Sequence, residues 1–335
     1  MDNKIIDKIN KKFPYTTLNL ELTNACNLHC PLCSTGSGFN TKPKGRMEFS
    51  RYKKLLDTFS PLITTIELIG SGEPFLHTEI TDFIAYAKSK KIWTTCYTNG
   101  TVMNEPEKIV KSGLNVIQIT LDGLTQEQHQ IYRKGSDLEI VLKNIRSLVL
   151  ARKKLHSFWP KIYINTLINK HNEKDYRLFI KQAKKLSVNG IKFTGIIDDL
   201  FKTSDLLPLS GKFKHSPRKN GYKCRFQKLI FGILSWDGDI QLCCLTPNHN
   251  NPVIKCNAFE EKDLLKTLDS EEFLNLTKKS GNYQFCEECF LKNNSSYLKE
   301  IALDWMPIWL LRRLTILKRD PLKATSLFIR KILNS

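Results

Sequence analysis

Three cysteines, Cys26, Cys30 and Cys33, stand close together early in the sequence, with three residues between the first two and two between the last two. They follow an apolar alternating run, Leu18 to Leu22, which predicts a strand that ends at a short cysteine-bearing loop. Three thiolates on one loop can hold three irons of a cubane iron–sulfur cluster and leave the fourth iron without a protein ligand. A second ligand can bind at such an open iron and receive an electron.

The same loop allows two other interpretations. A zinc site would need a fourth ligand, for which His29 is the candidate, and the choice of metal follows site geometry and ligand number. A disulfide is a weaker interpretation because three cysteines are an odd number. Disulfides also belong to secreted proteins, and Met1 to Phe13 is charged throughout and does not have the apolar core of a secretory signal. We therefore favour the iron–sulfur interpretation and expect a reducing, cytoplasmic setting, where ten cysteines are more often metal ligands than disulfides.

The composition indicates a folded chain. Its 335 residues are 41% apolar, which is enough for one large domain and a smaller one. No run reaches the roughly 18 uninterrupted apolar residues that cross a bilayer. The formal net charge of +19 raises the question of a nucleic-acid partner. The lysines are scattered over every predicted helix instead of forming one stripe, so we expect a solvated surface and no nucleic-acid partner.

The reactive residues depend on the elements that carry them. From residue 17 onward, short apolar runs alternate with longer helical patterns. The predicted strands are Leu18–Thr23, Thr65–Ile69, Trp93–Tyr97, Val116–Leu121, Lys161–Ile168 and Ile191–Ile196. The predicted helices are Ser50–Phe59, Glu79–Lys90, Glu105–Lys111, Leu138–Arg152 and Glu173–Leu186. This alternation predicts an α/β fold with a parallel sheet, a partial (β/α)6 TIM-like barrel with its reactive groups at the C-terminal ends of the strands.

Three further polar motifs follow predicted strands. In Gly70-Ser71-Gly72-Glu73-Pro74, glycines would let a ligand approach the backbone, and Glu73 can accept a hydrogen bond from an ammonium group. Thr98-Asn99-Gly100 is a turn by composition. Thr120-Leu121-Asp122-Gly123 is followed by Arg133, whose guanidinium can hold a carboxylate. Each motif taken alone is also compatible with an ordinary surface loop.

Together, these motifs resemble the radical S-adenosylmethionine (SAM) enzymes over roughly residues 15–295. Cys26, Cys30 and Cys33 match the CxxxCxxC signature of that family. Gly72-Glu73-Pro74 resembles its GGEP motif, with Ser71 in place of the first glycine. Further characteristic positions of the family correspond to Asn99, Gly100, Asp122, Gly123 and Arg133.

The resemblance implies two cofactors, a [4Fe–4S] cluster on the three cysteines and SAM bound at the open iron. One electron would cleave SAM, and the resulting 5′-deoxyadenosyl radical would abstract a hydrogen atom from a substrate. Ser71, Gly72 and Glu73 would meet the methionyl amine of SAM, and Thr120 and Arg133 would face its ribose and carboxylate. The full expected cofactor-binding set is Ser71, Gly72, Glu73, Asn99, Thr120, Asp122 and Arg133. An external electron donor such as flavodoxin or ferredoxin is an expected partner.

A second group of cysteines follows the predicted barrel. Cys224 and Cys243 flank Asp237-Gly238, a strong hairpin signal, and Cys286 and Cys289 have CxxC spacing. Four such cysteines can fully ligate a second [4Fe–4S] cluster, and a structural zinc site fits the same spacing. The arrangement resembles the twitch form of the SPASM/twitch subgroup, which implies one auxiliary [4Fe–4S] cluster that either passes an electron onward or braces the substrate site.

Three cysteines remain outside these two groups. Cys96 lies on a predicted strand, and we expect it in the core. Cys244 would point away from its neighbour Cys243 on a strand and is the main rival for the ligand role. We expect Cys256 to be free, with a role as the fourth ligand as the alternative.

We expect five segments along the chain. They are an N-terminal extension (1–14), the partial barrel (15–205), a linker (206–223), a twitch-type domain (224–295) and a basic amphipathic extension (296–335). The last segment mixes tryptophan and leucine with arginine and lysine, and Pro307 and Pro321 interrupt it. We expect a terminal helix packed on the barrel, with weak contact to a membrane surface or docking to a partner as the alternatives.

The leading functional hypothesis is a radical SAM oxidoreductase that acts on a sugar-like or cyclitol-like small molecule. Radical modification of a peptide or protein side chain is the alternative within the family. A zinc-binding RNA-interaction protein is the alternative from a different class. Asp122, Asp198, Asp199 and His215 are equivalent candidates for a general base.

Overall fold

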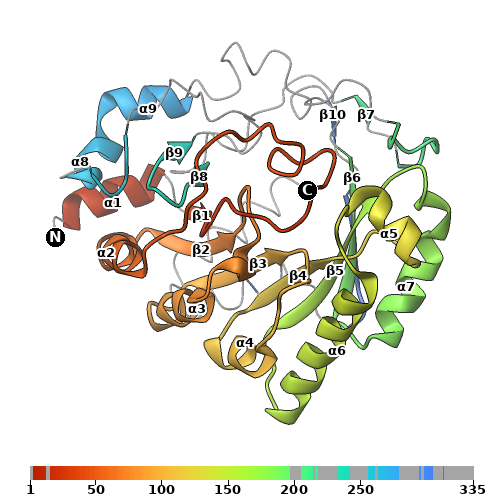
Figure 1. Ribbon diagram of the computed structural model, residues 1–335. Coiled ribbons are helices and arrows are strands. Elements are labelled where there is room, and N and C mark those ends of the chain that lie inside the picture. The colour runs from red at the N-terminus through yellow and green to blue at the C-terminus, as the bar shows by residue number, and fades with distance from the viewer. Residues whose placement is uncertain are drawn as a thin grey trace, which may run out of the picture.

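The computed structural model describes residues 3–12, 16–196, 205–213, 216–217, 232–241, 256–260, 263–278, 294–295, 298–304 and 312. Within these residues, the central feature is a sheet with the strand order β11-β6-β5-β4-β3-β2-β1-β8-β9 (Figure 1). Its strands are β1 (Thr16–Leu20), β2 (Ile63–Leu68), β3 (Trp93–Thr98), β4 (Val116–Thr120), β5 (Lys161–Ile168), β6 (Gly190–Gly195), β8 (Ile233–Leu234), β9 (Ile240–Gln241) and β11 (Leu298–Ala302). A separate antiparallel pair joins β7 (Ser216–Pro217) to β10 (Asn294–Ser295).

Helices alternate with the first six strands. They are α2 (Phe49–Phe59), α3 (Ile80–Ser89), α4 (Pro106–Ser112), α5 (Gln126–Tyr132), α6 (Leu138–Lys154) and α7 (Tyr176–Lys185), with the 3₁₀ turns η1 (Pro74–Leu76) and η2 (Glu173–Asp175). The N-terminal helix α1 (Asn3–Lys12) packs with α8 (Leu264–Asp269), which is followed by α9 (Glu271–Lys278). Strands β1 to β6 pair parallel with one another, so the α/β fold with a parallel sheet is confirmed.

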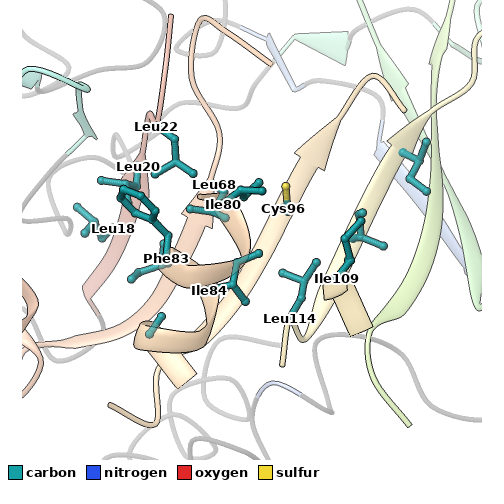
Figure 2. Close-up of a cluster of buried hydrophobic side chains, with 14 of the residues drawn as sticks. Leu18, Leu20, Leu22, Leu68, Ile80, Phe83, Ile84, Cys96, Ile109 and Leu114 are labelled. Carbon is teal, nitrogen blue, oxygen red and sulfur yellow. The ribbon is translucent and has the colours of Figure 1, made fainter. Parts of the chain in front are cut away.

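The alternation of side chains along the strands explains where the core lies. Leu18 and Leu20 of β1 are fully buried under the helices, whereas the intervening Asn19 belongs to the opposite, inner face of the sheet. Figure 2 shows Phe83 of α3 placed among these leucines. Cys96 is buried in the same cluster, as expected for a core cysteine.

Both edges of the parallel sheet are extended by later parts of the chain. Strand β8 continues the sheet beside β1 through Leu20 and Leu234, and β9 returns antiparallel to it. The predicted hairpin at Asp237-Gly238 is confirmed, since Gly238 has φ +96°, where glycine is favoured. At the opposite edge, β11 pairs antiparallel with β6.

The C-terminal part of the chain also reaches the barrel through one described side chain. Arg312 donates a hydrogen bond from Nη2 to Thr17 Oγ1 over 2.9 Å, and its Nη1 lies 3.9 Å from Glu67 Oε1. Among the described residues, there is no helix with the length and apolar character needed to cross a membrane.

Phe83 anchors α3 on the sheet. Its ring centroid lies 4.7 Å from that of Tyr52, 5.1 Å from Phe49 and 4.9 Å from His77, and the side chain is fully buried. Phe83→Ala is expected to lower the free energy of unfolding by about 3–5 kcal/mol, because a large buried ring leaves a cavity. Urea unfolding followed by circular dichroism measures this.

The matched control for Phe83→Ala is Leu150→Ala on α6, where the leucine is 64% exposed. This change is expected to cost less than about 0.5 kcal/mol. Equal losses in the two variants would contradict the assignment of Phe83 to the packed core.

Candidate functional site

The cysteine loop, residues 21–33, begins at the C-terminal end of β1. Cys30 is buried with Leu28 and with Tyr132 of α5. Cys26 and Cys33 are partly buried against the same cluster, together with Leu32, Leu167 and Leu206. The three predicted thiols therefore share one apolar environment at the strand ends, and none of them is in a disulfide.

Burial also affects the chemistry of these thiols. Desolvation raises the pKa of Cys26, and it raises the pKa of Cys30 to about 11, with the nearby Arg133 acting in the opposite direction. The raised pKa values keep the unligated thiols protonated and make them poor free nucleophiles, and a bound cluster would displace their protons. In the described part of the chain, no three His, Cys, Asp or Glu side chains gather closely enough to hold a single metal ion. A cubane cluster takes one thiolate per iron and does not need that gathering.

The loop after β2 lies directly against the cysteine loop. The Glu73 backbone N–H donates to the Ala25 carbonyl over 2.8 Å. At Gly72, a Cβ would lie closer than 3.0 Å to the carbonyl oxygens of Thr23 and Ala25. Glycine is required at this position because the two backbones are in contact.

The Glu73 carboxylate is buried and ties two strand ends together. Its Oε1 accepts hydrogen bonds from Thr98 Oγ1 at 2.7 Å and from the Phe75 N–H at 3.1 Å. Its Oε2 accepts from the Asn99 N–H at 2.7 Å. Burial raises the pKa of Glu73, and these three donors oppose that rise. Both oxygens therefore already have protein partners, so contact with the methionyl amine of SAM stays a proposal.

Asn99 links the third strand end to the cysteine loop. Its Nδ2 donates to Asn27 Oδ1 over 2.9 Å, and its Oδ1 accepts from the Thr101 N–H and hydroxyl at 2.9 and 2.7 Å. Gly100, which follows it, has φ +79°. The predicted turn after β3 is thus a structural partner of the cysteine loop.

Asp122 and Arg133 form a buried ion pair on the other side of the cysteine loop. Arg133 Nε donates to Asp122 Oδ2 over 2.6 Å, and Asp122 Oδ1 accepts from the Leu167 N–H at 2.7 Å. Arg133 Nη1 lies 3.8 Å from Cys30 Sγ. Burial alone would lower the pKa of Arg133, but the Asp122 carboxylate and Cys30 hold it above its ordinary value. Asp122 is committed to this pair, which makes it a poor general base.

The other predicted cofactor residues lie on the same edge of the sheet. Ser71 donates its backbone N–H to Glu21 Oε2 over 2.7 Å. Thr120 ends β4, and its buried Oγ1 has no hydrogen-bond partner among the described residues, so it can serve a ligand. Glu21 and Asn27 were not predicted. The apolar alternation of β1 continues past its end, and it places Glu21 on the face opposite Leu20 and Leu22. This alternation could have pointed to Glu21.

Several predicted residues fall outside the described residues. These are Asp198, Asp199, His215, Cys224, Cys243, Cys244, Cys286 and Cys289. Cys256 is described; it is half-buried against the main core and is not in a disulfide.

The contact at Gly72 yields a direct test. Gly72→Ala is expected to push the Glu73 loop away from the cysteine loop and to lower the iron retained after anaerobic purification by up to about half, since the clash is with backbone. Gly211→Ala is the matched control, because a Cβ there meets nothing within 4 Å. Iron content equal to wild type in both variants would contradict the role given to Gly72.

Comparison with known proteins agrees with this geometry. Residues 20–183 match the model of the Radical SAM superfamily. The tungsten-containing aldehyde ferredoxin oxidoreductase cofactor-modifying protein of Pyrococcus furiosus is 22% identical over 325 residues, which cover 86% of this chain and 90% of that protein. The GTP 3′,8-cyclase of Clostridium botulinum is 28% identical over 304 residues, which cover 84% and 89%.

The structural comparison concerns the fold. The crystal structure of Streptococcus suis SuiB bound to its precursor peptide SuiA superposes with a TM-score of 0.63 at 16% identity, covering 87% of this chain and 73% of SuiB. Radical SAM domains bind SAM and an iron–sulfur cluster, for which the three thiols at the strand ends are suited. The match over residues 20–183 places this part of the chain in the radical SAM superfamily.

Proposed function

We propose that this protein is an enzyme that binds a [4Fe–4S] cluster through Cys26, Cys30 and Cys33 and uses SAM to remove a hydrogen atom from a substrate. The observation that carries the proposal is the shared apolar environment of the three thiols. Arg133 lies beside Cys30, and the Gly72–Glu73 loop contacts the backbone just before Cys26. When bound, the cluster and SAM together supply a 5′-deoxyadenosyl radical.

Some residues around the thiols exclude water, and others bind the cofactors. Leu28, Leu32 and Tyr132 exclude water from the cysteine loop, which protects a reactive site from side reactions. Asp122 fixes the Arg133 guanidinium through Nε, so that its other end lies beside Cys30 and can hold the carboxylate of SAM. The unpartnered Thr120 hydroxyl is suited to the ribose.

Ser71, Gly72 and Glu73 keep their proposed role at the methionyl amine. Gly72 contributes by letting the two loops touch, and Glu21 contributes by fixing the backbone of Ser71. Flavodoxin or ferredoxin is the proposed electron donor.

For the substrate, we propose a sugar-like or cyclitol-like small molecule. Two relatives that align over more than four-fifths of this chain are named for a cofactor and for GTP, both small molecules. The second candidate is a peptide, which the SuiB structure contains. That likeness extends to the fold only, so the small molecule is favoured.

The auxiliary [4Fe–4S] cluster, bound by Cys224, Cys243, Cys286 and Cys289, also stays part of the proposal. Its support is the hairpin β8–β9, which docks on the barrel and ends two residues before Cys243. Cys244 remains the main rival ligand, and Cys256 remains a further alternative, because it precedes Asn257, which is hydrogen-bonded to this hairpin.

Removing one thiol tests the assignment of the first cluster. Wild-type protein purified without oxygen is expected to hold about eight irons per chain, and Cys30→Ala about four, because one cluster is lost. Reduced Cys30→Ala given SAM is expected to release no 5′-deoxyadenosine. Cys96→Ala, which removes a core cysteine outside the loop, is the control and should match wild type in both measurements.

Two results would contradict this assignment. One is zinc without iron in the wild-type protein, which would favour the zinc-binding alternative. The other is unchanged 5′-deoxyadenosine release by Cys30→Ala.

The substrate class is tested by fractionating a cell extract. The dialysable fraction, treated with peptidase, is expected to raise 5′-deoxyadenosine release by the reduced enzyme, because a hydrogen donor commits the radical to product. If only the peptidase-sensitive fraction does so, the substrate is a peptide and the small-molecule proposal is wrong.

A further inference from the structure

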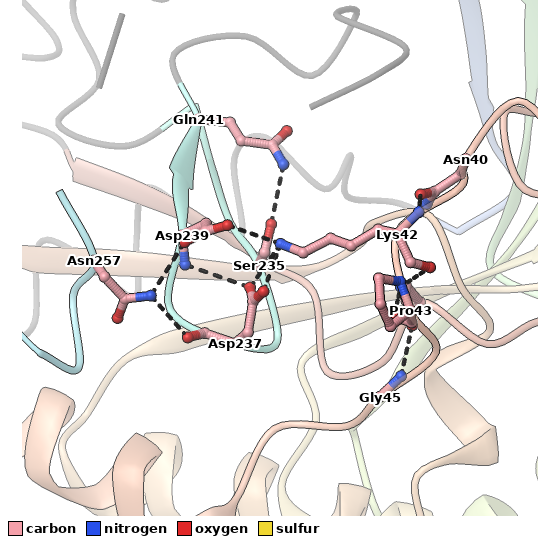
Figure 3. A network of polar contacts seen from close by, with 10 residues as sticks. Asn40, Lys42, Pro43, Gly45, Ser235, Asp237, Asp239, Gln241 and Asn257 are labelled. Atoms are coloured by element: carbon pink, nitrogen blue, oxygen red, sulfur yellow. Dashed lines mark hydrogen bonds and ion pairs between the residues drawn. The ribbon is translucent and has the colours of Figure 1, made fainter. Parts of the chain in front are cut away.

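Lys42 connects the cysteine-loop side of the barrel to the β8–β9 hairpin (Figure 3). Its Nζ lies 2.6 Å from Asp237 Oδ2 and 2.9 Å from Asp239 Oδ2. The Lys42 side chain is 15% exposed, that of Asp237 26% and that of Asp239 54%. Asp237 is therefore the stronger partner, since a shielded pair is screened less by water and salt.

The backbone that follows Lys42 is held on the strand end that precedes Cys26. Asn24 Nδ2 donates to the Pro43 carbonyl over 2.9 Å, and Asn24 Oδ1 accepts from the Gly45 N–H at 2.9 Å. Thr23 Oγ1 donates to the Gly45 carbonyl over 2.6 Å. Residues 42–45 are thus bonded to the cysteine loop, and Lys42 extends from it towards the hairpin.

The hairpin meets the same region through its backbone and its aromatic ring. The Glu21 N–H donates to the Leu234 carbonyl over 3.0 Å. At Gly45, a Cβ would lie closer than 3.0 Å to the Trp236 ring, so the ring packs directly on this backbone. Asn257 Nδ2 holds the hairpin turn from the other side, at 3.0 Å from the Asp237 carbonyl and 3.1 Å from Asp239 Oδ1.

Asp237 and Asp239 both pair with Lys42, and the charges of Lys42 and Asp237 also act on the buried Glu21 carboxylate. Burial raises the pKa of Glu21, Lys42 opposes that rise, and Asp237 adds to it. Burial alone would lower the pKa of Lys42, but the two aspartates hold it above its ordinary value. Without Lys42, the carboxylates would repel one another across the junction.

We propose that Lys42 is a positioning residue that locks the β8–β9 hairpin onto the cysteine loop. The lock fixes the segment that leads to Cys243 relative to the loop that carries Cys26, which are more than two hundred residues apart. Because Glu21 also holds the Ser71 N–H, the lock extends to the loop after β2. The inference concerns only the protein contacts, and it holds whether or not Cys243 binds iron.

Hydrogen exchange of the full-length protein, purified without oxygen, tests the lock. In Lys42→Met, peptides covering residues 40–47 and 232–241 are expected to exchange about tenfold faster, because carboxylates lose a buried partner. Peptides from α6 should exchange as in wild type. Asp237→Asn is expected to speed hairpin exchange more than Asp239→Asn, since Asp239 is the more exposed partner.

Two further variants separate positioning from general stability. Lys42→Arg keeps the charge and is expected to restore exchange to within about threefold of wild type. Lys154→Met removes the exposed pair with Glu107, whose side chains are 74% and 43% exposed, and should leave both peptides unchanged. Wild-type exchange in Lys42→Met, faster exchange in only one of the two peptides, or no rescue by arginine would overturn the proposal.

Discussion

The buried carboxylate of Glu73 is the interaction on which the rest of the site depends. It accepts three hydrogen bonds, from Phe75, Thr98 and Asn99, and its own N–H bonds to the cysteine loop at Ala25. A buried carboxylate without donors is costly, and a buried donor that loses its acceptor costs about 1–3 kcal/mol. Glu73 therefore holds the ends of β2 and β3 and the cysteine loop in one arrangement.

Carboxylates that accept hydrogen bonds from neighbouring backbone also lie at two other strand ends. Glu21, after β1, accepts from the Ser71 N–H of the next loop, and Asp122, after β4, accepts from the Leu167 N–H of β5. In each case, a carboxylate placed just beyond a strand fixes the backbone of its neighbour. Parallel strands bring their C-terminal ends to one edge, and these carboxylates make that edge rigid. A site that holds thiols, SAM and substrate in fixed relative positions needs such a rigid edge.

The strand pattern could be predicted because apolar alternation and helical periodicity are local properties. The predicted strand Lys161–Ile168 agrees with the observed one, and Trp93–Tyr97 is one residue shorter than β3. Helix α5 (Gln126–Tyr132) was missed, since seven residues are too few to show a helical period. Helix α1 was missed as well, because half of its residues are charged and the segment was interpreted as an extension.

The positions of the cysteines and of the strand-end motifs were also local, so the candidate site could be located from sequence. The roles of individual side chains could not be predicted from sequence. Glu73 accepts hydrogen bonds from Thr98 and Asn99, which are 25 and 26 residues away and are brought to it by strand packing, and its expected role at SAM stays a prediction. The contact between Lys42 and Asp237 spans 195 residues, and no pattern in the sequence connects them.

At the site, the three thiols of the cysteine loop share one apolar environment, and the Arg133 guanidinium lies beside Cys30. The central claim is that this loop leaves one iron of a cluster open to SAM. The most direct measurement is Mössbauer spectroscopy of the full-length protein loaded with isotopically enriched iron, before and after addition of SAM. The account predicts one iron site whose signal shifts when SAM binds, while the other sites stay unchanged. Spectra identical with and without SAM would contradict it.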